Sequence, residues 1–236
     1  MVKVRYILIV LIIFISSCAT TTGENIQKAS AHYKIGKSYL YENNIQSAYV
    51  EFQKALEFNP NDKEALNAIG IIQLLKFEDF QKAVDFFQKA IKIDPNFSEA
   101  YNNIGGAYEK LGKFNEAIDS YKRALSNLMY QSPEKAYNNL ARLYYRLGRY
   151  DDATDAYKDA LRRVNNFYSS YYGLALCYNA KGRYGDAATA IARALELDPL
   201  YKGDKDKALK DFENKKLIAK GEEERDIIDY LEILKY

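Results

Sequence analysis

Residues that build catalytic centres are scarce in this sequence. Its 236 residues include one histidine, His32, two cysteines and no tryptophan. Without a second histidine or a local pair of carboxylates, His32 lacks the partners that a hydrolytic triad or a metal site requires. Gly105 and Gly106 lie within a helical pattern, where close packing accounts for them better than a phosphate-binding loop does. We therefore expect no catalytic residues, no metal, no cofactor and no small-molecule substrate.

Helix-breaking residues are also few, with 4 prolines and 12 glycines. Hydrophobic residues make up 48% of the chain and charged residues 28%, a balance typical of folded proteins rich in helix. Lys3 and Arg5 are the only charged residues before Cys18, so without them the formal net charge of +2 falls to zero. A neutral chain has no general attraction for polyanions, which argues against a nucleic-acid partner.

Residues 1–17 have the pattern of a signal peptide. Lys3 and Arg5 precede an apolar run of about ten residues, shorter than the roughly 20 that a membrane-spanning helix needs. The run ends in Ile-Ser-Ser-Cys, and the sequence around Cys18 resembles the lipobox of bacterial lipoproteins. The resemblance implies cleavage before Cys18 and a lipid on that cysteine. An ordinary cleaved leader and an uncleaved anchor are the alternatives.

Residues 18–28 are polar and lack apolar periodicity, so we expect a short tether between the lipid and the folded part. Ala19 follows Cys18, where some bacteria read an aspartate as a signal for retention in the inner membrane. The absence of an aspartate at this position favours an outer-membrane lipoprotein that faces the periplasm. Cys177 stands alone within a helical pattern and is expected to pack as a small apolar residue.

The rest of the chain repeats itself with a period of about 34 residues. Five segments align on a small residue, at Gly36, Gly70, Gly105, Ala141 and Ala175. Each is followed by two alanines, at Ala48 and Ala55, Ala83 and Ala90, Ala117 and Ala124, Ala153 and Ala160, and Ala187 and Ala194. A bulky apolar residue lies between the alanines, at Phe52, Phe87, Tyr121, Tyr157 and Ile191. This spacing predicts pairs of antiparallel helices, in which the small residues allow close packing.

The pattern resembles the tetratricopeptide repeat. The resemblance implies an all-α fold, a right-handed superhelical solenoid of about five repeats with a concave groove lined by the first helix of each pair. The expected repeats are 29–62, 63–97, 98–133, 134–167 and 168–201, which together span 29–201. The turn inside each pair needs a residue that tolerates positive φ, supplied by Asn43, Gly112, Gly148 and Gly182. The second repeat has Phe77 there and one inserted residue, so its turn must differ.

Residues 202–236 show helical periodicity without the repeat signature. Lysines precede Gly221 and three glutamates follow it, which agrees with the dipoles of one helix that ends and another that begins. We expect two C-terminal capping helices, with Leu217 and Ile218 at the far end of the first.

Most of the 22 tyrosines fall on packing positions of the repeat. Other aromatic, basic and amide side chains fall on the groove side of the first helices and suit capture of a peptide, because rings bury area and amides bond an extended backbone. The alternative is a polar surface that only faces solvent. The candidate peptide-binding residues are Tyr33, Lys37, Asn67, Asn102, Asn103, Lys135, Asn138, Asn139, Arg142, Tyr145, Arg146 and Tyr172.

The join between the third and fourth repeats is lengthened and carries a distinctive sequence, Leu-x-Tyr-x-Ser-Pro-Glu-x-Ala-x-x-Asn-Leu, within residues 124–140. Together with the lipobox and the length, this join resembles the type IV pilus biogenesis and stability lipoproteins of the PilW/PilF type. The resemblance implies a periplasmic scaffold at the outer membrane that promotes localisation or multimerisation of the pilus secretin. A scaffold for outer-membrane β-barrel assembly or for cell-wall hydrolases is the alternative.

Overall fold

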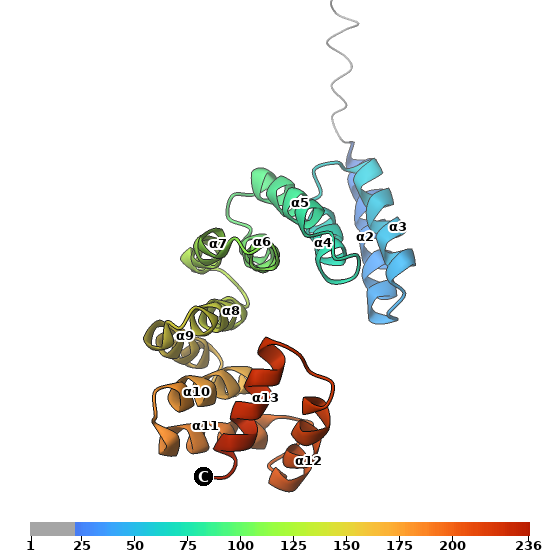
Figure 1. The fold of residues 1–236 in the computed structure, drawn as a ribbon. Coiled ribbons are helices and arrows are strands. Elements are labelled where there is room, and N and C mark those ends of the chain that lie inside the picture. Colours follow the sequence, from blue (N-terminus) through green and yellow to red (C-terminus); the bar gives the residue numbers. More distant parts are fainter. Residues whose placement is uncertain (1–21) are drawn as a thin grey trace, which may run out of the picture. The chain divides into compact units, whose positions relative to one another are not determined.

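The computed structural model describes residues 22–236, and all regular secondary structure in that range is α-helical (Figure 1). The described residues fall into two compact units, which divide between Ile93 and Asp94. The described part of the first unit has four helices: α2 (Gly23–Tyr41), α3 (Ile45–Phe58), α4 (Lys63–Leu75) and α5 (Phe80–Ile93). The second unit has eight: α6 (Ser98–Lys110), α7 (Phe114–Ser126), α8 (Pro133–Arg146), α9 (Tyr150–Arg163), α10 (Tyr168–Ala180), α11 (Tyr184–Leu197), α12 (Lys205–Lys216) and α13 (Glu222–Ile233).

Five antiparallel helix pairs correspond to the five sequence repeats. The pairs are α2 with α3, α4 with α5, α6 with α7, α8 with α9, and α10 with α11. The alanines of the repeat, from Ala48 to Ala194, are fully buried at the contacts of these helices. The paired all-α arrangement expected of a tetratricopeptide solenoid is therefore confirmed.

Capping side chains explain where several helices begin. The Thr22 hydroxyl accepts a hydrogen bond from the backbone N–H of Asn25 at 3.2 Å, and α2 begins directly after it. Residues 23–28, which we expected in the tether, are therefore helical, and this part of the prediction is wrong. Cys18 and the leader lie outside the described residues. Pro133 occupies the first turn of α8, where its missing N–H costs no helical hydrogen bond.

The turns inside the pairs follow the expected chemistry. Asn43, Gly112, Gly148 and Gly182 have φ values of 57°, 71°, 72° and 69°, as the sequence predicts. In the second repeat the inserted residue changes the turn, and Glu78 takes the positive φ of 52° in place of Phe77.

The glycines of the first helices make room for aromatic rings. A Cβ atom on Gly105 would lie 2.6 Å from a ring carbon of Tyr121, which is fully buried in the partner helix. The ring of Tyr157 in the fourth repeat instead approaches Gly173 of the next repeat, where a Cβ atom would lie 2.0 Å from Cζ. The glycines thus allow close packing of aromatic rings against a helix, in addition to close packing of the two helix backbones.

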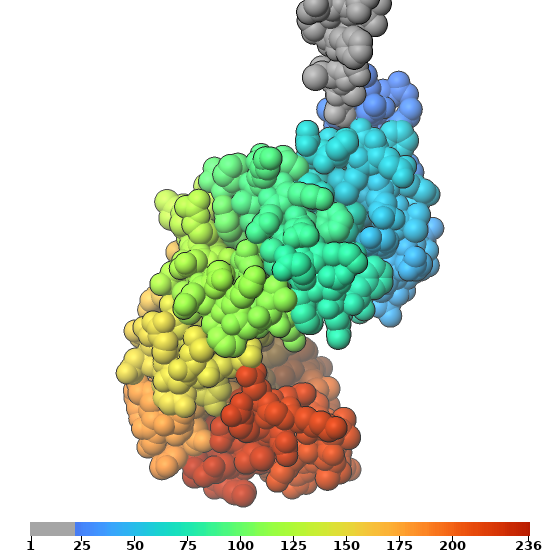
Figure 2. Space-filling model, turned by 45° about the horizontal axis from the view of Figure 1, so that its top comes forward, coloured from blue at the N-terminus to red at the C-terminus, as the bar shows by residue number. Residues whose placement is uncertain are grey.

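The two C-terminal helices are present, and Gly221 between them has a φ of 66°. Leu217 and Ile218 are 83% and 81% exposed at the end of α12, as a far end would be. Helix α13 then returns and contacts α10 and α11 as well as α12. Figure 2 shows this C-terminal segment (red) packed directly on the neighbouring part of the second unit. Its return sets the environment of several candidate binding residues.

Candidate functional site

The candidate residues of the first unit lie on α2 and α4. Tyr33 is half-buried with its ring centroid 5.6 Å from that of Phe52, and Lys37 places its Nζ 5.9 Å from the centre of the Tyr33 ring. Burial is the main cause that raises the pKa of Tyr33. Asn67 is half-buried on α4. Tyr33 and Lys37 thus form a local cation–π pair that leaves the Lys37 side chain at the surface.

In the second unit, the amide side chains link neighbouring first helices. Asn139 Nδ2 on α8 donates a hydrogen bond to Asn102 Oδ1 on α6 at 3.0 Å, and Asn102 donates to Asn103 at 3.5 Å. The Ser170 hydroxyl on α10 donates to Asn138 Oδ1 at 3.0 Å. The amide side chains therefore use part of their hydrogen-bonding capacity within the chain, where they stabilise the contact between neighbouring repeats. That part is not available to bind the backbone of a peptide. Lys135, at the start of α8, is exposed.

A buried carboxylate, Glu109, connects the two candidate arginines. It accepts a hydrogen bond from the Tyr121 hydroxyl, and its carboxylate lies 2.9 Å from Arg146 Nη1 and 3.5 Å from Arg142 Nη2. Only 4% of the Glu109 side chain is exposed, so both cations compensate a desolvated charge. Arg142 and Arg146 therefore have a structural role in addition to any role in binding. The repeat pattern does not predict the role of Glu109, because nothing in it marks that acid as buried.

Helix α13 packs against the face of α8 and α10 on which the remaining candidate binding residues, Tyr145, Arg146 and Tyr172, lie. Tyr145 donates a hydrogen bond to Asp229 Oδ2 at 3.4 Å, and Arg146 Nε lies 2.7 Å from Glu222 Oε2. The rings of Tyr172 and Tyr230 meet edge to face at 5.4 Å. Tyr145, Arg146 and Tyr172 therefore lie on a face of the repeats that a helix of the same chain partly covers.

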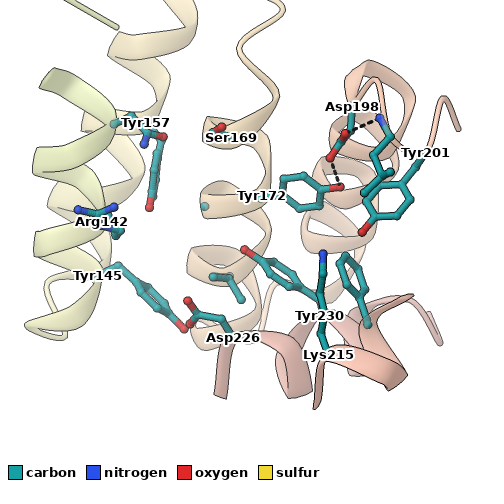
Figure 3. A pocket seen from close by; sticks show the side chains of 15 residues that line it. Arg142, Tyr145, Tyr157, Ser169, Tyr172, Asp198, Tyr201, Lys215, Asp226 and Tyr230 are labelled. Carbon is teal, nitrogen blue, oxygen red and sulfur yellow. Dashed lines mark hydrogen bonds between the residues drawn. The ribbon is translucent and has the colours of Figure 1, made fainter. Parts of the chain in front are cut away.

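A cavity of about 410 Å³ remains between α13 and the repeat helices (Figure 3). Its lining comes from α8, α9, α10, α12, α13 and the segment after α11, and includes the candidates Asn138, Arg142, Tyr145 and Tyr172. The Tyr172 hydroxyl donates to Asp198 Oδ2 at 3.1 Å on one side of the cavity. Burial, followed by the nearby Asp198 carboxylate, raises the pKa of Tyr172.

Asp226 of α13 also lines the cavity, close to Tyr145 in Figure 3. Burial is the main cause that raises its pKa to about 6, and the carboxylates of Asp229 and Glu222 add to the effect. Sequence reasoning did not find Asp226, Tyr230 or Asp198, because their proximity depends on the return of α13. The apolar spacing of Ile227, Leu231 and Leu234 indicates a buried face on α13, but it does not indicate which helices cover that face.

The remaining polar and reactive side chains have structural partners. His32 Nδ1 lies 2.7 Å from Glu51 Oε2, and its ring stacks on Phe58 at 5.4 Å. Cys177 is fully buried, and burial raises the pKa of its thiol to about 12, as expected of a packed apolar residue. Within residues 22–236, no group of three His, Cys, Asp or Glu side chains could hold a metal ion. No helix in that range is long and apolar enough to cross a membrane.

Four family models, each described as a tetratricopeptide or TPR repeat, match residues 29–62, 78–112, 97–166 and 138–202. This chain is a tetratricopeptide-repeat protein. Such repeats form protein-binding scaffolds that are generally non-catalytic, so the chain has protein partners as its expected ligands.

Solved structures share this fold. A crystal structure of PilW, described as a widely conserved type IV pilus biogenesis factor, has a TM-score of 0.69 and 21% identity, and the match covers 88% of this chain and 96% of that one. Pseudomonas aeruginosa PilF has a TM-score of 0.68 and 20% identity, with coverage of 87% and 98%. MamA has a TM-score of 0.58 and 26% identity, with coverage of 69% and 94%. No curated protein sequence matches this chain.

Proposed function

We propose that this tetratricopeptide-repeat protein is a lipid-anchored periplasmic scaffold for type IV pilus biogenesis, which acts on the localisation or multimerisation of the pilus secretin. Lipid on Cys18 would hold the repeats at the outer membrane, and the first helices of the repeats would bind a segment of the secretin or of another pilus component. Several acyl chains give durable anchoring, because each buried methylene contributes about 0.8 kcal/mol. The mechanism is scaffolding, with no chemical step.

The observation that supports the proposal most directly is the packed structure of the join between the third and fourth repeats. Tyr130 in the middle of the join is only 8% exposed and packs with Ala124 and Ala136. Asn127 holds the join from both sides, since its Nδ2 donates to the Asn96 carbonyl at 2.9 Å and its Oδ1 accepts from the Met129 N–H at 2.9 Å. The residues that resemble the pilus lipoproteins thus form an ordered element of the fold and are not an insertion in a loose loop.

The structural comparisons support the proposal through their extent. PilW and PilF are matched over 96% and 98% of their own length, which is what a protein with the same number and order of repeats would show. At 20–21% identity this likeness concerns the fold, so the pilus role is carried by the join and the lipobox together.

Recovery of partners from the organism that encodes the chain tests the proposal. The lipidated full-length protein is solubilised in detergent and pulled down, and secretin multimers are measured in cells that lack it. We expect the secretin or another pilus component to be recovered. We also expect the Cys18→Ala variant to lose incorporated palmitate and its place in the outer-membrane fraction.

Two surface variants distinguish specific from nonspecific recovery. Lys135→Glu reverses an exposed charge in the first turn of α8, where a carboxylate suits the helix dipole and the fold is preserved. Lys122→Glu makes the same change on α7 and serves as the matched control. Reduced recovery with Lys135→Glu alone supports binding by the first helices. Recovery of barrel-assembly or cell-wall proteins with no pilus component would contradict the pilus role.

A further inference from the structure

The cavity beneath α13 has the size and lining of a binding site for one side chain. Its volume of about 410 Å³ lies at the small end of the range for ligand pockets, which is roughly 300–1,000 Å³. Rings of Tyr145, Tyr157, Tyr172 and Tyr230 form much of its lining. Aromatic walls with a few polar groups are typical of pockets that hold an extended side chain with a polar end.

The positive charges at the cavity are already paired with carboxylates outside its lining. Arg142 lies 3.5 Å from Glu109, and Lys215 Nζ lies 2.7 Å from Asp211 Oδ2. Both carboxylates have further donors, namely Arg146 for Glu109 and the Tyr201 hydroxyl for Asp211. These cations therefore offer little net attraction to an anion in the cavity.

The negative charge of Asp226 is in a different position. Asp226 lines the cavity and is half-buried, yet it forms no ion pair with any described residue. Asp229 and Glu222 on the same helix add negative potential at its carboxyl group, and Arg225 and Arg146 add positive potential there. Asp198, on the opposite side of the cavity, accepts hydrogen bonds from the Tyr172 hydroxyl and the Leu200 N–H and forms no ion pair within residues 22–236. Two carboxylates that form no ion pair within residues 22–236 therefore face the cavity between aromatic rings, whereas its two cations are paired with other carboxylates.

We propose that this cavity binds the positively charged side chain of a lysine or arginine from the partner protein, with the cationic group beside Asp226 and the alkyl stem among the tyrosine rings. Ammonium and guanidinium groups are attracted both by a carboxylate and by the faces of aromatic rings. The inference rests on the proposed protein-binding role and names the chemistry of one contact in it. It does not depend on whether the partner belongs to a pilus.

Binding of a cation is expected to strengthen as the pH rises through about 6. A cation favours the ionised form of Asp226, whose pKa is raised to about 6 by burial and neighbouring carboxylates. The charged and titratable groups around Asp226 are Tyr145 and Arg146 from α8, Tyr157 from α9, and Glu222, Arg225, Asp229 and Tyr230 of α13. The tyrosines among them have raised pKa values and stay neutral in this range, so Asp226 dominates the change.

The test uses the full chain in detergent, labelled with ¹³C in its tyrosine rings, and four blocked tripeptides of the form Gly-X-Gly. X is lysine, arginine, norleucine or glutamate, and norleucine has the lysine stem without the charge. We expect the lysine and arginine peptides to shift the ring signals of Tyr145, Tyr172 and Tyr230. The norleucine peptide should bind at least about tenfold more weakly, because close desolvated charge pairs contribute that much or more.

Two variants complete the test. Asp226→Asn should abolish the preference for lysine over norleucine, and Asp119→Asn, an exposed acid on α7, should leave it unchanged. Equal binding of lysine and norleucine, preferred binding of glutamate, or no ring shift with any peptide would each overturn the proposal. A negative result here leaves the pilus pull-down to decide the proposed function by itself.

Discussion

Replacement of Asp226 by asparagine should make the second unit less dependent on pH and more stable near neutrality. The pKa of this carboxyl group is about 6 in the folded chain and 3.8 in its ordinary state. Since the folded pKa is raised, the folded state binds the proton more tightly than the unfolded state. Stability associated with Asp226 is therefore fully present below about pH 4, falls as the pH rises between about 4 and 6, and stays low above that range.

The size of the effect follows from the shift. Two units of pKa correspond to about 3 kcal/mol, because each unit contributes about 1.4 kcal/mol. Asp226 is only half-buried, so solvent screening reduces the expected cost of its charge to about 1–2 kcal/mol. About half of this cost develops between pH 5 and pH 8. Carboxyl groups whose pKa values are lowered by ion pairs, such as those of Glu51 and Asp211, are already ionised in this range and do not change the stability there.

Urea unfolding followed by circular dichroism at about pH 5 and about pH 8 measures the difference. We expect wild type to lose about 0.5–1 kcal/mol more than Asp226→Asn between these two pH values, and the variant to be the more stable protein at pH 8. Asp119→Asn is the charge-matched control and should follow wild type. Parallel pH dependences in wild type and Asp226→Asn would refute the claim that α13 buries this carboxyl group against the repeats.

Three further substitutions probe the packing that forms the site, each measured by thermal unfolding. Gly173→Ala should cost about 1–3 kcal/mol, because the new Cβ would lie 2.0 Å from Cζ of Tyr157, whereas Gly185→Ala meets nothing within 4 Å and should not destabilise α11. Arg146→Met should cost about 3 kcal/mol by removing a cation from the buried Glu109, and an equal result for the exposed Arg193→Met would contradict that role. Tyr130→Ala should cost about 3 kcal/mol and loosen the join, while Leu128→Ala, at a side chain 93% exposed, should change nothing measurable.

The local sequence was sufficient to predict the helix pairs, because the residues that pack each pair lie within one repeat. Small residues at regular spacing are completely buried, as Ala117 and Ala124 are, and the four positive φ values that the sequence predicts occur at Asn43 and the three turn glycines. These features depend on contacts within a repeat or between neighbours, so one period of sequence contains the information. The start of α2 was missed because the capping hydroxyl of Thr22 outweighs the weak periodicity after it.

The candidate site was predicted only in part, because its contacts join residues far apart in the sequence. The sequence pattern assigns Asn102 and Asn139 to the same face of the repeats, but it does not predict the hydrogen bond that joins their side chains across two repeats. Arg146 was predicted as a peptide-binding residue on the groove side, and the sequence does not show that its guanidinium group pairs with Glu109 and Glu222. A repeat pattern shows which positions face outward from a helix pair and does not show what later covers them.

Helix pairing, turn chemistry and the buried alanines of this protein are thus settled by sequence alone, since they follow from short-range sterics and burial. The place of α13 is settled only in three dimensions. Its apolar spacing would suit several neighbours, and the choice of α8 and α10 depends on the summed contacts of Tyr230 with Tyr172, Asp229 with Tyr145 and Glu222 with Arg146. That choice converts part of an open helix face into a cavity with a half-buried carboxyl group, because long-range packing and desolvation act together there.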